Sequence, residues 1–276
     1  MIIKLILTIF CWLAVLPIVY GFNFGTHYNL IIIIVYASLL FIMFIFSRFT
    51  TKIIICVLFS STYLILKDLP SEENLWKAGN FFIIFSAFLP SLWLLRSTAI
   101  TMPSVEKTQN LLSNLVSTKI LSGIQVTSHV LGGVLNIGTF PLLSSVIPKN
   151  SKYRMRQVSG EAAIRGMNTA VLWSPFFVSF AVGQLYLPSQ SAWLGIAFGL
   201  LVALLFNLIS IRFLIGKFTL SYLFEAVSCV KPIFPRLLIL SLSVLAVGQI
   251  FDKTALNAIV IVIPILVVVQ MFRRPE

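Results

Sequence analysis

Long apolar runs, separated by short polar stretches, dominate the pattern of residues along the chain. The run NLIIIIVYASLLFIMFIF, residues 29–46, has the length and the lack of charge that a helix needs to cross a hydrocarbon core of about 30 Å. Such runs predict membrane-spanning helices at residues 5–21, 30–47, 53–66, 79–95, 168–187, 191–211, 237–250 and 255–271. The segments 53–66 and 237–250 are short for a span and require tilt or an adjustment of the bilayer.

Composition supports a membrane class. The 276 residues are 59% hydrophobic and 10% charged, whereas a soluble domain carries about 25% charged residues. A β-barrel would show short alternating segments instead of continuous runs. The chain is therefore predicted to be an all-α polytopic protein, one transmembrane domain over residues 1–276 with about eight transmembrane helices. Its first segment resembles a signal peptide, but no small-residue cleavage site follows it, so we interpret it as a span.

Residues 120–147 are polar, and their hydrophobicity alone does not show whether they cross the membrane or return to the same side. The distribution of Lys and Arg distinguishes the two possibilities. A single crossing would divide the 20 basic residues 7 to 13 between the two sides of the membrane. A re-entrant hairpin leaves 17 of the 20 on the cytoplasmic side and only Lys67, Lys77 and Lys253 outside. Because cytoplasmic loops are rich in Lys and Arg, the hairpin is favoured, with both termini cytoplasmic and the protein in the cytoplasmic (inner) membrane.

Local chemistry agrees with a hairpin. The stretch GGVLNIGTFP places Gly132, Gly133, Gly138 and Pro141 around Asn136 and Thr139. Glycine and proline allow the backbone to turn, so we expect the turn at residues 134–140. Non-helical backbone at membrane depth occurs where it is buried in protein or lines a cavity, which makes the turn a candidate binding site. The alternative is a single helix kinked by glycine, without a site.

A second interruption is predicted in MNTAVLWSPFF. Pro175 removes a helical hydrogen bond and disfavours helical geometry at Ser174, so the span 168–187 should be broken there. The side chains of Asn168, Thr169 and Ser174, with carbonyls near Val171, are candidates to face the hairpin turn. Two interrupted elements at mid-membrane are typical of secondary transporters. An ordinary proline kink is the alternative.

The order of these elements resembles one repeat of the ion-transporter superfamily, which includes divalent-anion/sodium symporters, arsenite efflux pumps and citrate carriers. The resemblance rests on SVEKTQNLLSNLVSTK, GVLNIGTFPLL and GMNTAVLWSPFF, and covers about residues 79–211. It implies a Ser-Asn-Thr type motif at the hairpin tip that binds sodium or substrate. Here Asn136 and Thr139 match, the leading Ser does not, and Ile137 and Gly138 separate them.

The remaining segments complete the expected organisation. Residues 1–95 hold four N-terminal spans, 97–119 a cytoplasmic amphipathic segment, 120–147 the hairpin, 168–211 the broken helix and a further span, 216–236 an interfacial helix, and 237–276 two C-terminal spans. Transporters of this superfamily contain two inverted repeats, whereas one is visible here. A homodimer, a partner chain, a longer parent protein and a misleading resemblance are the alternatives.

Several single residues are candidates for function. His129 is a possible proton site, or a buried histidine paired with the hydroxyl of Ser128 or Thr127. Arg165 either pairs with Glu161, four residues away, or faces the cavity and binds an anion. The basic run KNSKYRMR is expected to anchor the topology and touch anionic lipid. Three separated cysteines, expected to be small buried residues, are Cys11, Cys56 and Cys229.

The chemistry available excludes most enzyme classes. The chain has eight acidic residues, two histidines and no HExxH or comparable cluster, so we predict no catalytic residue and no bound metal. No cofactor is expected beyond a coupling Na⁺ or H⁺, and no nucleic acid partner. The predicted function is secondary transport of a small anionic solute, with a membrane scaffold as the alternative. The predicted substrate or ion site comprises Asn136, Gly138, Thr139, Arg165, Asn168, Thr169, Ser174 and Pro175.

Overall fold

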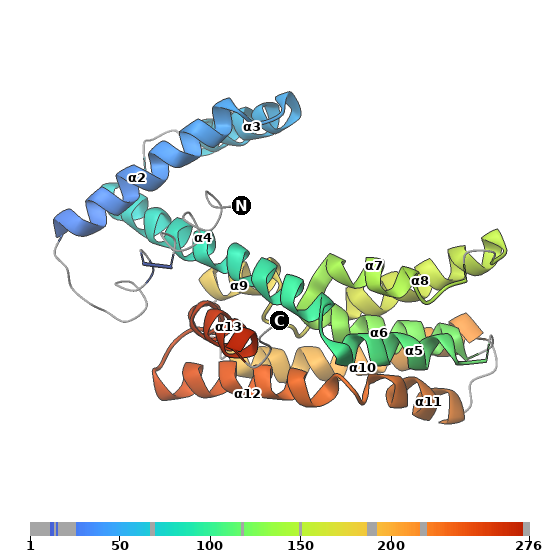
Figure 1. The fold of residues 1–276 in the computed structure, drawn as a ribbon. Coiled ribbons are helices and arrows are strands. Elements are labelled where there is room, and N and C mark those ends of the chain that lie inside the picture. Colours follow the sequence, from blue (N-terminus) through green and yellow to red (C-terminus); the bar gives the residue numbers. More distant parts are fainter. Residues whose placement is uncertain are drawn as a thin grey trace. The chain divides into compact units, whose positions relative to one another are not determined.

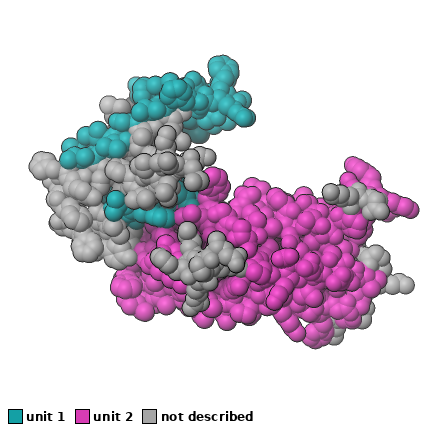
Figure 2. Space-filling model, viewed as in Figure 1, with its two compact units in different colours: residues 1–90 teal, residues 91–276 magenta. Residues whose placement is uncertain are grey.

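A computed structural model describes residues 12–13, 15, 26–66, 70–116, 119–148, 151–186, 192–215 and 220–272 (Figure 1). Helices and turns make up this part of the chain, which confirms the all-α class. The first predicted span, residues 5–21, lies almost entirely outside the described residues. The chain forms two compact units, residues 1–90 and 91–276 (Figure 2).

The first unit contains α2 (Thr26–Ile45), α3 (Phe49–Leu66) and the first part of α4 (Glu72–Ile100). Their residue ranges overlap three of the predicted spans, 30–47, 53–66 and 79–95. None of the 18 residues of α3 is buried, and Phe59 and Ile65 are 75% and 79% exposed. Apolar side chains exposed over a whole helix are expected where the surroundings are lipid. At the start of α4, Lys77 pairs with Glu73 at 2.7 Å.

Four helices in the described part of the chain are long and apolar enough to cross a membrane. They are Phe49–Leu66, Glu72–Ile100, Ala192–Phe213 and Ile120–Ser144, the last of which is interrupted by the turn described below. A bent pair, Ser221–Val230 with Phe234–Ile250, adds a fifth if its two parts form one span. The count of eight spans stays a prediction. α4 extends beyond the predicted span 79–95 at both ends, so part of the expected outer loop is helical.

The chain reverses within residues 120–147. α6 (Ile120–Leu135) ends at a 3₁₀ turn, η1 (Asn136–Gly138), and α7 (Thr139–Ser144) returns beside α8 (Figure 1). Leu143 and Val146 pack in one buried cluster with Ile120 and Ile124. A straight helix would place residues 120 and 143 about 35 Å apart at 1.5 Å per residue. The second arm therefore folds back toward the first, and the entry of this hairpin into a membrane stays a prediction.

The second interrupted element follows. α8 (Tyr153–Ala170) ends at a turn over residues 171–177, and α9 (Val178–Tyr186) continues after it. α8 begins well before the predicted span 168–187, so most of the expected cytoplasmic loop is helical. It packs closely on α6, where a Cβ atom at Gly166 would meet the carbonyl of Gln125 and lie 2.9 Å from the backbone nitrogen of His129. Small residues at a helix crossing permit such an approach.

Two further helices, α5 and α10, pack around this pair. α5 (Pro103–Ser113) buries Ser104, Thr108 and Leu112, one face of the predicted amphipathic segment. Gln109 of α5 donates from Nε2 to the carbonyl of Leu142, 2.9 Å away, and so holds the second arm of the hairpin. α10 (Ala192–Ile215) packs against both α6 and α8.

The C-terminal elements begin with α11 (Leu220–Val230), which packs on α6 within the predicted interfacial segment. Lys119 at the base of the hairpin pairs with Glu225 of α11 at 2.5 Å. α12 (Phe234–Ile250) follows at a bend of 69°, and α13 (Ala255–Phe272) packs against it. Pro235 lies in the first turn of α12, where a proline is well tolerated because its missing N–H has no helical partner there.

Candidate functional site

The broken helix touches the hairpin next to its turn. The hydroxyl of Ser174 donates to the carbonyl of Gly133, in the last turn of α6, and accepts from the backbone N–H of Phe176 at 3.2 Å. Ser174 is fully buried and lies outside α8, as its position before Pro175 requires. Pro175, itself buried, has no N–H to donate to the carbonyl of Val171. One buried hydroxyl therefore joins the two interruptions.

Asn136 sets the backbone of the hairpin turn. Its φ is 52° and its ψ is −134°, and its N–H donates to the carbonyl of Gly132, where α6 ends. Positive φ is uncommon outside glycine and is tolerated by asparagine more often than by most residues. Asn136 is half-buried, and Ile137 beside it is exposed.

A cation lies across the same turn. A Cβ atom at Gly138 would come within 2.8 Å of Cδ of Arg96 and closer to its Nε, so the glycine leaves the room that this side chain fills. Arg96 is half-buried and belongs to α4, inside a helix that can span a membrane. No carboxylate in the described part of the chain forms an ion pair with it. The guanidinium can therefore hold an anion in two parallel hydrogen bonds.

Two hydrogen-bonding groups next to the turn are left unused. The hydroxyl of Thr139 is buried, and so is the indole N–H of Trp173, whose ring packs where a Cβ atom of Gly133 would lie. Among the described residues neither group has a hydrogen-bond partner. Because buried polar groups are nearly always paired, both are candidates to bind a solute at the turn.

A chain of buried polar side chains joins α6, α8 and α10. His129 Nδ1 lies 3.0 Å from Thr169 Oγ1, and Asn207 Nδ2 donates to the same oxygen at 2.7 Å. Gln125 Nε2 donates to Oδ1 of Asn207 at 3.1 Å. We name His129, Thr169, Asn207 and Gln125 the polar chain. It runs through the packing interface of three helices.

His129 shares its hydroxyl partner with a backbone carbonyl. Thr169 donates to the carbonyl of Gly166 at 2.7 Å. Its oxygen also lies within hydrogen-bonding distance of His129 Nδ1, and which of these two atoms donates depends on the tautomer of the imidazole. Ser128 instead donates to the carbonyl of Ala163 at 2.6 Å, so neither it nor the unpaired Thr127 holds the histidine as expected.

Arg165 does not pair with Glu161. It is exposed and its Nη1 lies 3.5 Å from the hydroxyl of Ser210 in α10, while Glu161 accepts from Gln157 at 3.3 Å. The expected bridge is therefore wrong, because Arg165 extends toward α10. Asn168 is also exposed, in contrast to its half-buried neighbour Thr169.

The structure thus brings together part of the predicted set. Ser174 and Pro175 lie at the break next to the hairpin, with Asn136, Gly138 and Thr139 at the turn. Thr169 joins the polar chain instead, and Arg165 and Asn168 lie exposed on α8. Sequence reasoning missed Arg96, Gln125 and Asn207. Each of these three is an isolated polar residue within an apolar run, and that pattern could have marked them as candidates.

A cavity of about 420 Å³ lies between the two arms of the hairpin and α8. Ile124 comes from the first arm, Leu143 and Ser144 from the second, and Arg156 and Ser159 from α8. Its volume is in the range of small-molecule sites, about 300–1,000 Å³. The hydroxyl of Ser159 is buried and has no hydrogen-bond partner among the described residues.

The described residues contain no group of three or more His, Cys, Asp or Glu placed to hold a metal ion. Cys229 is buried, whereas Cys56 is exposed on α3, so the expectation of burial is wrong for Cys56. Cys11 lies outside the described residues. Asn, Thr, Ser, Trp and Arg are therefore the groups available at the turn.

Comparisons of the chain with protein families, characterised proteins and solved structures give no match.

Proposed function

We propose that the protein is a secondary transporter, or one half of one, that moves a small anion across the membrane where the hairpin turn meets the broken helix. The observation that carries the proposal is the hydrogen bond from Ser174 to the carbonyl of Gly133, because it joins two interrupted elements of a chain whose other helices include several long and apolar enough to span a membrane. Irregular backbone of this kind, paired across two elements, is the pattern of transporter binding sites.

The anionic class of solute is supported by Arg96. A cation within a helix that can span the membrane is costly unless it has a use, and the guanidinium fork fits a carboxylate or an oxyanion. It lies on Gly138, next to the unused hydroxyl of Thr139. Arg165, the arginine favoured from the sequence, is a weaker candidate because it is exposed and directed at Ser210.

A cation whose gradient drives transport has two candidate binding sites. The break at residues 171–177 can offer main-chain carbonyls, which suit Na⁺. The imidazole of His129 suits a proton, and its partner Thr169 lies one turn before the break. Uptake driven separately by a Na⁺ gradient and by a pH gradient distinguishes these two places.

One hairpin and one broken helix make half of the arrangement that the resemblance implies. We therefore propose that the functional unit contains a second copy or a partner chain. The exposed apolar surface of α3, which includes Phe49 and Phe59, is available for lipid or for a helix of that partner. The same surface favours the second candidate function, a membrane scaffold without transport activity.

The test uses purified full-length chain in two steps. A thermal-shift screen in detergent with succinate, citrate, phosphate and arsenite, with and without Na⁺, should find an anion that raises the melting temperature. The same labelled anion should enter proteoliposomes against empty-vesicle controls. Arg96→Gln should abolish both effects, and Arg165→Gln should preserve them. No shift across the screen together with uptake no faster than in empty vesicles favours the scaffold.

A further inference from the structure

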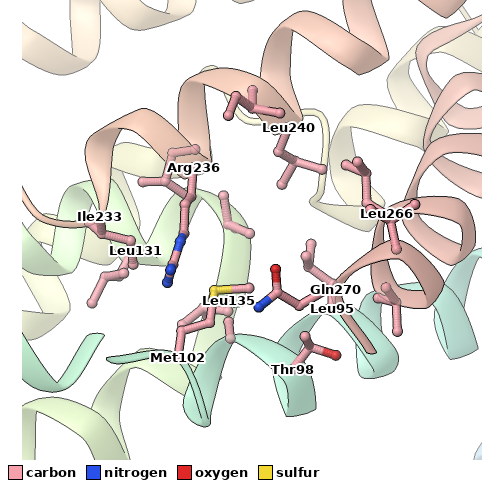
Figure 3. A pocket seen from close by; sticks show the side chains of 16 residues that line it. Leu95, Thr98, Met102, Leu131, Leu135, Ile233, Arg236, Leu240, Leu266 and Gln270 are labelled. Atoms are coloured by element: carbon pink, nitrogen blue, oxygen red, sulfur yellow. The ribbon is translucent and has the colours of Figure 1, made fainter. Parts of the chain in front are cut away.

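A second cavity, of about 410 Å³, lies between α4, α6, α12 and α13 within the second unit (Figure 3). It is separate from the site at the hairpin turn, since neither Arg96 nor Gly138 lines it. Most of its lining is apolar, and the exceptions are Thr98, Arg236 and Gln270. Sites for small molecules commonly combine an apolar lining with a few polar groups of this kind.

Two polar side chains reach into the cavity from different helices. Arg236 comes from the first turn of α12 and Gln270 from the last turns of α13, and both side chains point into the cavity (Figure 3). Arg236 Nη1 donates to the hydroxyl of Ser104 at 2.6 Å. A hydroxyl does not neutralise a guanidinium, and the ion pairs of the described residues involve other side chains. The cavity therefore presents a positive charge.

The apolar part has a closed floor and an open rim. Leu131, Leu135 and Leu240 are 1%, 3% and 5% exposed and form the floor. Ile239 and Val269 are 57% and 43% exposed and stand at the outer edge. The cavity thus opens on an apolar outer surface. In a bilayer such a surface is covered by acyl chains, so lipid has direct access.

We propose that this cavity binds an anionic lipid of the surrounding bilayer. One acyl chain lies against the leucine floor, and the headgroup phosphate accepts hydrogen bonds from Arg236 and Gln270. An apolar cavity does not hold water well, and a free phosphate would leave the floor uncovered. A zwitterionic lipid carries its own cation beside the phosphate and gains less from Arg236. Basic pockets between membrane helices on the cytoplasmic side, where the charge distribution places Arg236, select anionic headgroups.

Native mass spectrometry of the full chain tests the proposal. The purified protein in neutral detergent is offered equal amounts of phosphatidylglycerol and phosphatidylcholine. Wild-type protein should retain the anionic lipid in preference by about tenfold, the ratio that one charge-assisted hydrogen bond provides. Arg236→Gln should remove that preference. Lys231→Gln, at an exposed basic residue outside the cavity, should keep it.

Two further experiments distinguish binding of a lipid from binding of a free anion. Leu240→Trp fills the floor and should reduce retention of both lipids, while inorganic phosphate at millimolar concentration should not displace phosphatidylglycerol. Equal retention of the two lipids by wild-type protein would overturn the proposal, even if no variant folds. Displacement by inorganic phosphate would overturn it too, because it would identify a free-anion site. A folded Arg236→Gln variant that still prefers phosphatidylglycerol over phosphatidylcholine would also overturn the proposal.

Discussion

The side chain of Arg96 in α4 lies against Gly138 at the turn of the hairpin, in space that any Cβ atom at position 138 would occupy. This contact joins a helix that can span the membrane to the interruption that we propose as the binding site. It gives glycine at this position a reason beyond turn formation, because the backbone φ of Gly138 is −58°, which any residue adopts. Glycine is needed here because the side chain of Arg96 fills the space that a Cβ atom would take, and substitution of Gly138 tests this.

Gly138→Ala should displace the guanidinium of Arg96 and weaken anion binding. Overpacking at a tight contact costs about 1–3 kcal/mol, and the flexible end of an arginine can move to relieve it. We therefore expect the melting temperature to fall by a few degrees and anion uptake to fall much more. Gly195→Ala is the matched control, since a Cβ atom there meets nothing within 4 Å. Similar uptake by both variants would remove Arg96 from the site.

Asn136 allows the backbone role of the turn to be separated from a role of its side chain. With φ at 52°, asparagine and alanine both place a Cβ atom in backbone that favours glycine, so Asn136→Gly should gain about 1 kcal/mol of stability, whereas Asn136→Ala should not. If the amide also binds the solute, both variants should lose uptake. Chemical denaturation and uptake are measured in parallel. Full uptake by Asn136→Gly would show that the amide binds nothing.

Ser174→Ala should uncouple the broken helix from the hairpin. Removing the hydroxyl leaves the carbonyl of Gly133 without this donor, which costs about 1–3 kcal/mol and corresponds to roughly ten- to a hundredfold in affinity. The apparent affinity for the transported anion, from the concentration dependence of uptake, is the readout. Ser243→Ala on α12 is the control. Equal small effects at both serines would support the scaffold.

The polar chain should contribute stability more than specificity. Asn207→Leu leaves Gln125 and Thr169 each without one partner, and interhelical hydrogen bonds in membranes are worth about 0.6–2 kcal/mol. We expect a lower midpoint of unfolding in detergent titrations. Thr62→Val, which removes only a bond to the helix's own backbone at Leu58, should leave the midpoint unchanged. If the two variants unfold alike, the polar chain does not stabilise the packing of α6, α8 and α10.

Glycine and proline act locally, so the positions of the turn and of the break can be read along the chain, whereas the re-entrant path inferred from the basic residues stays a prediction. The turn at Asn136–Gly138 and the break before Pro175 fall where those residues indicate. Gln125 and Asn207 were out of reach, because their hydrogen bond joins positions 82 apart on two helices. Arg96 was missed for a different reason: its charge suggested that the span ended at residue 95, whereas the helix continues to Ile100.

The central claim is that residues 120–147 enter the membrane and return to the same side, so that the turn can form a site with the broken helix. Cysteine accessibility in intact cells or oriented vesicles tests it directly. After replacement of the native cysteines, single cysteines are placed at Val116 and Lys152, both exposed, on either side of the hairpin. The account predicts that an impermeant maleimide labels both positions only from the cytoplasmic side. Labelling of the two positions from opposite sides would contradict it, and the proposed site would fall with it.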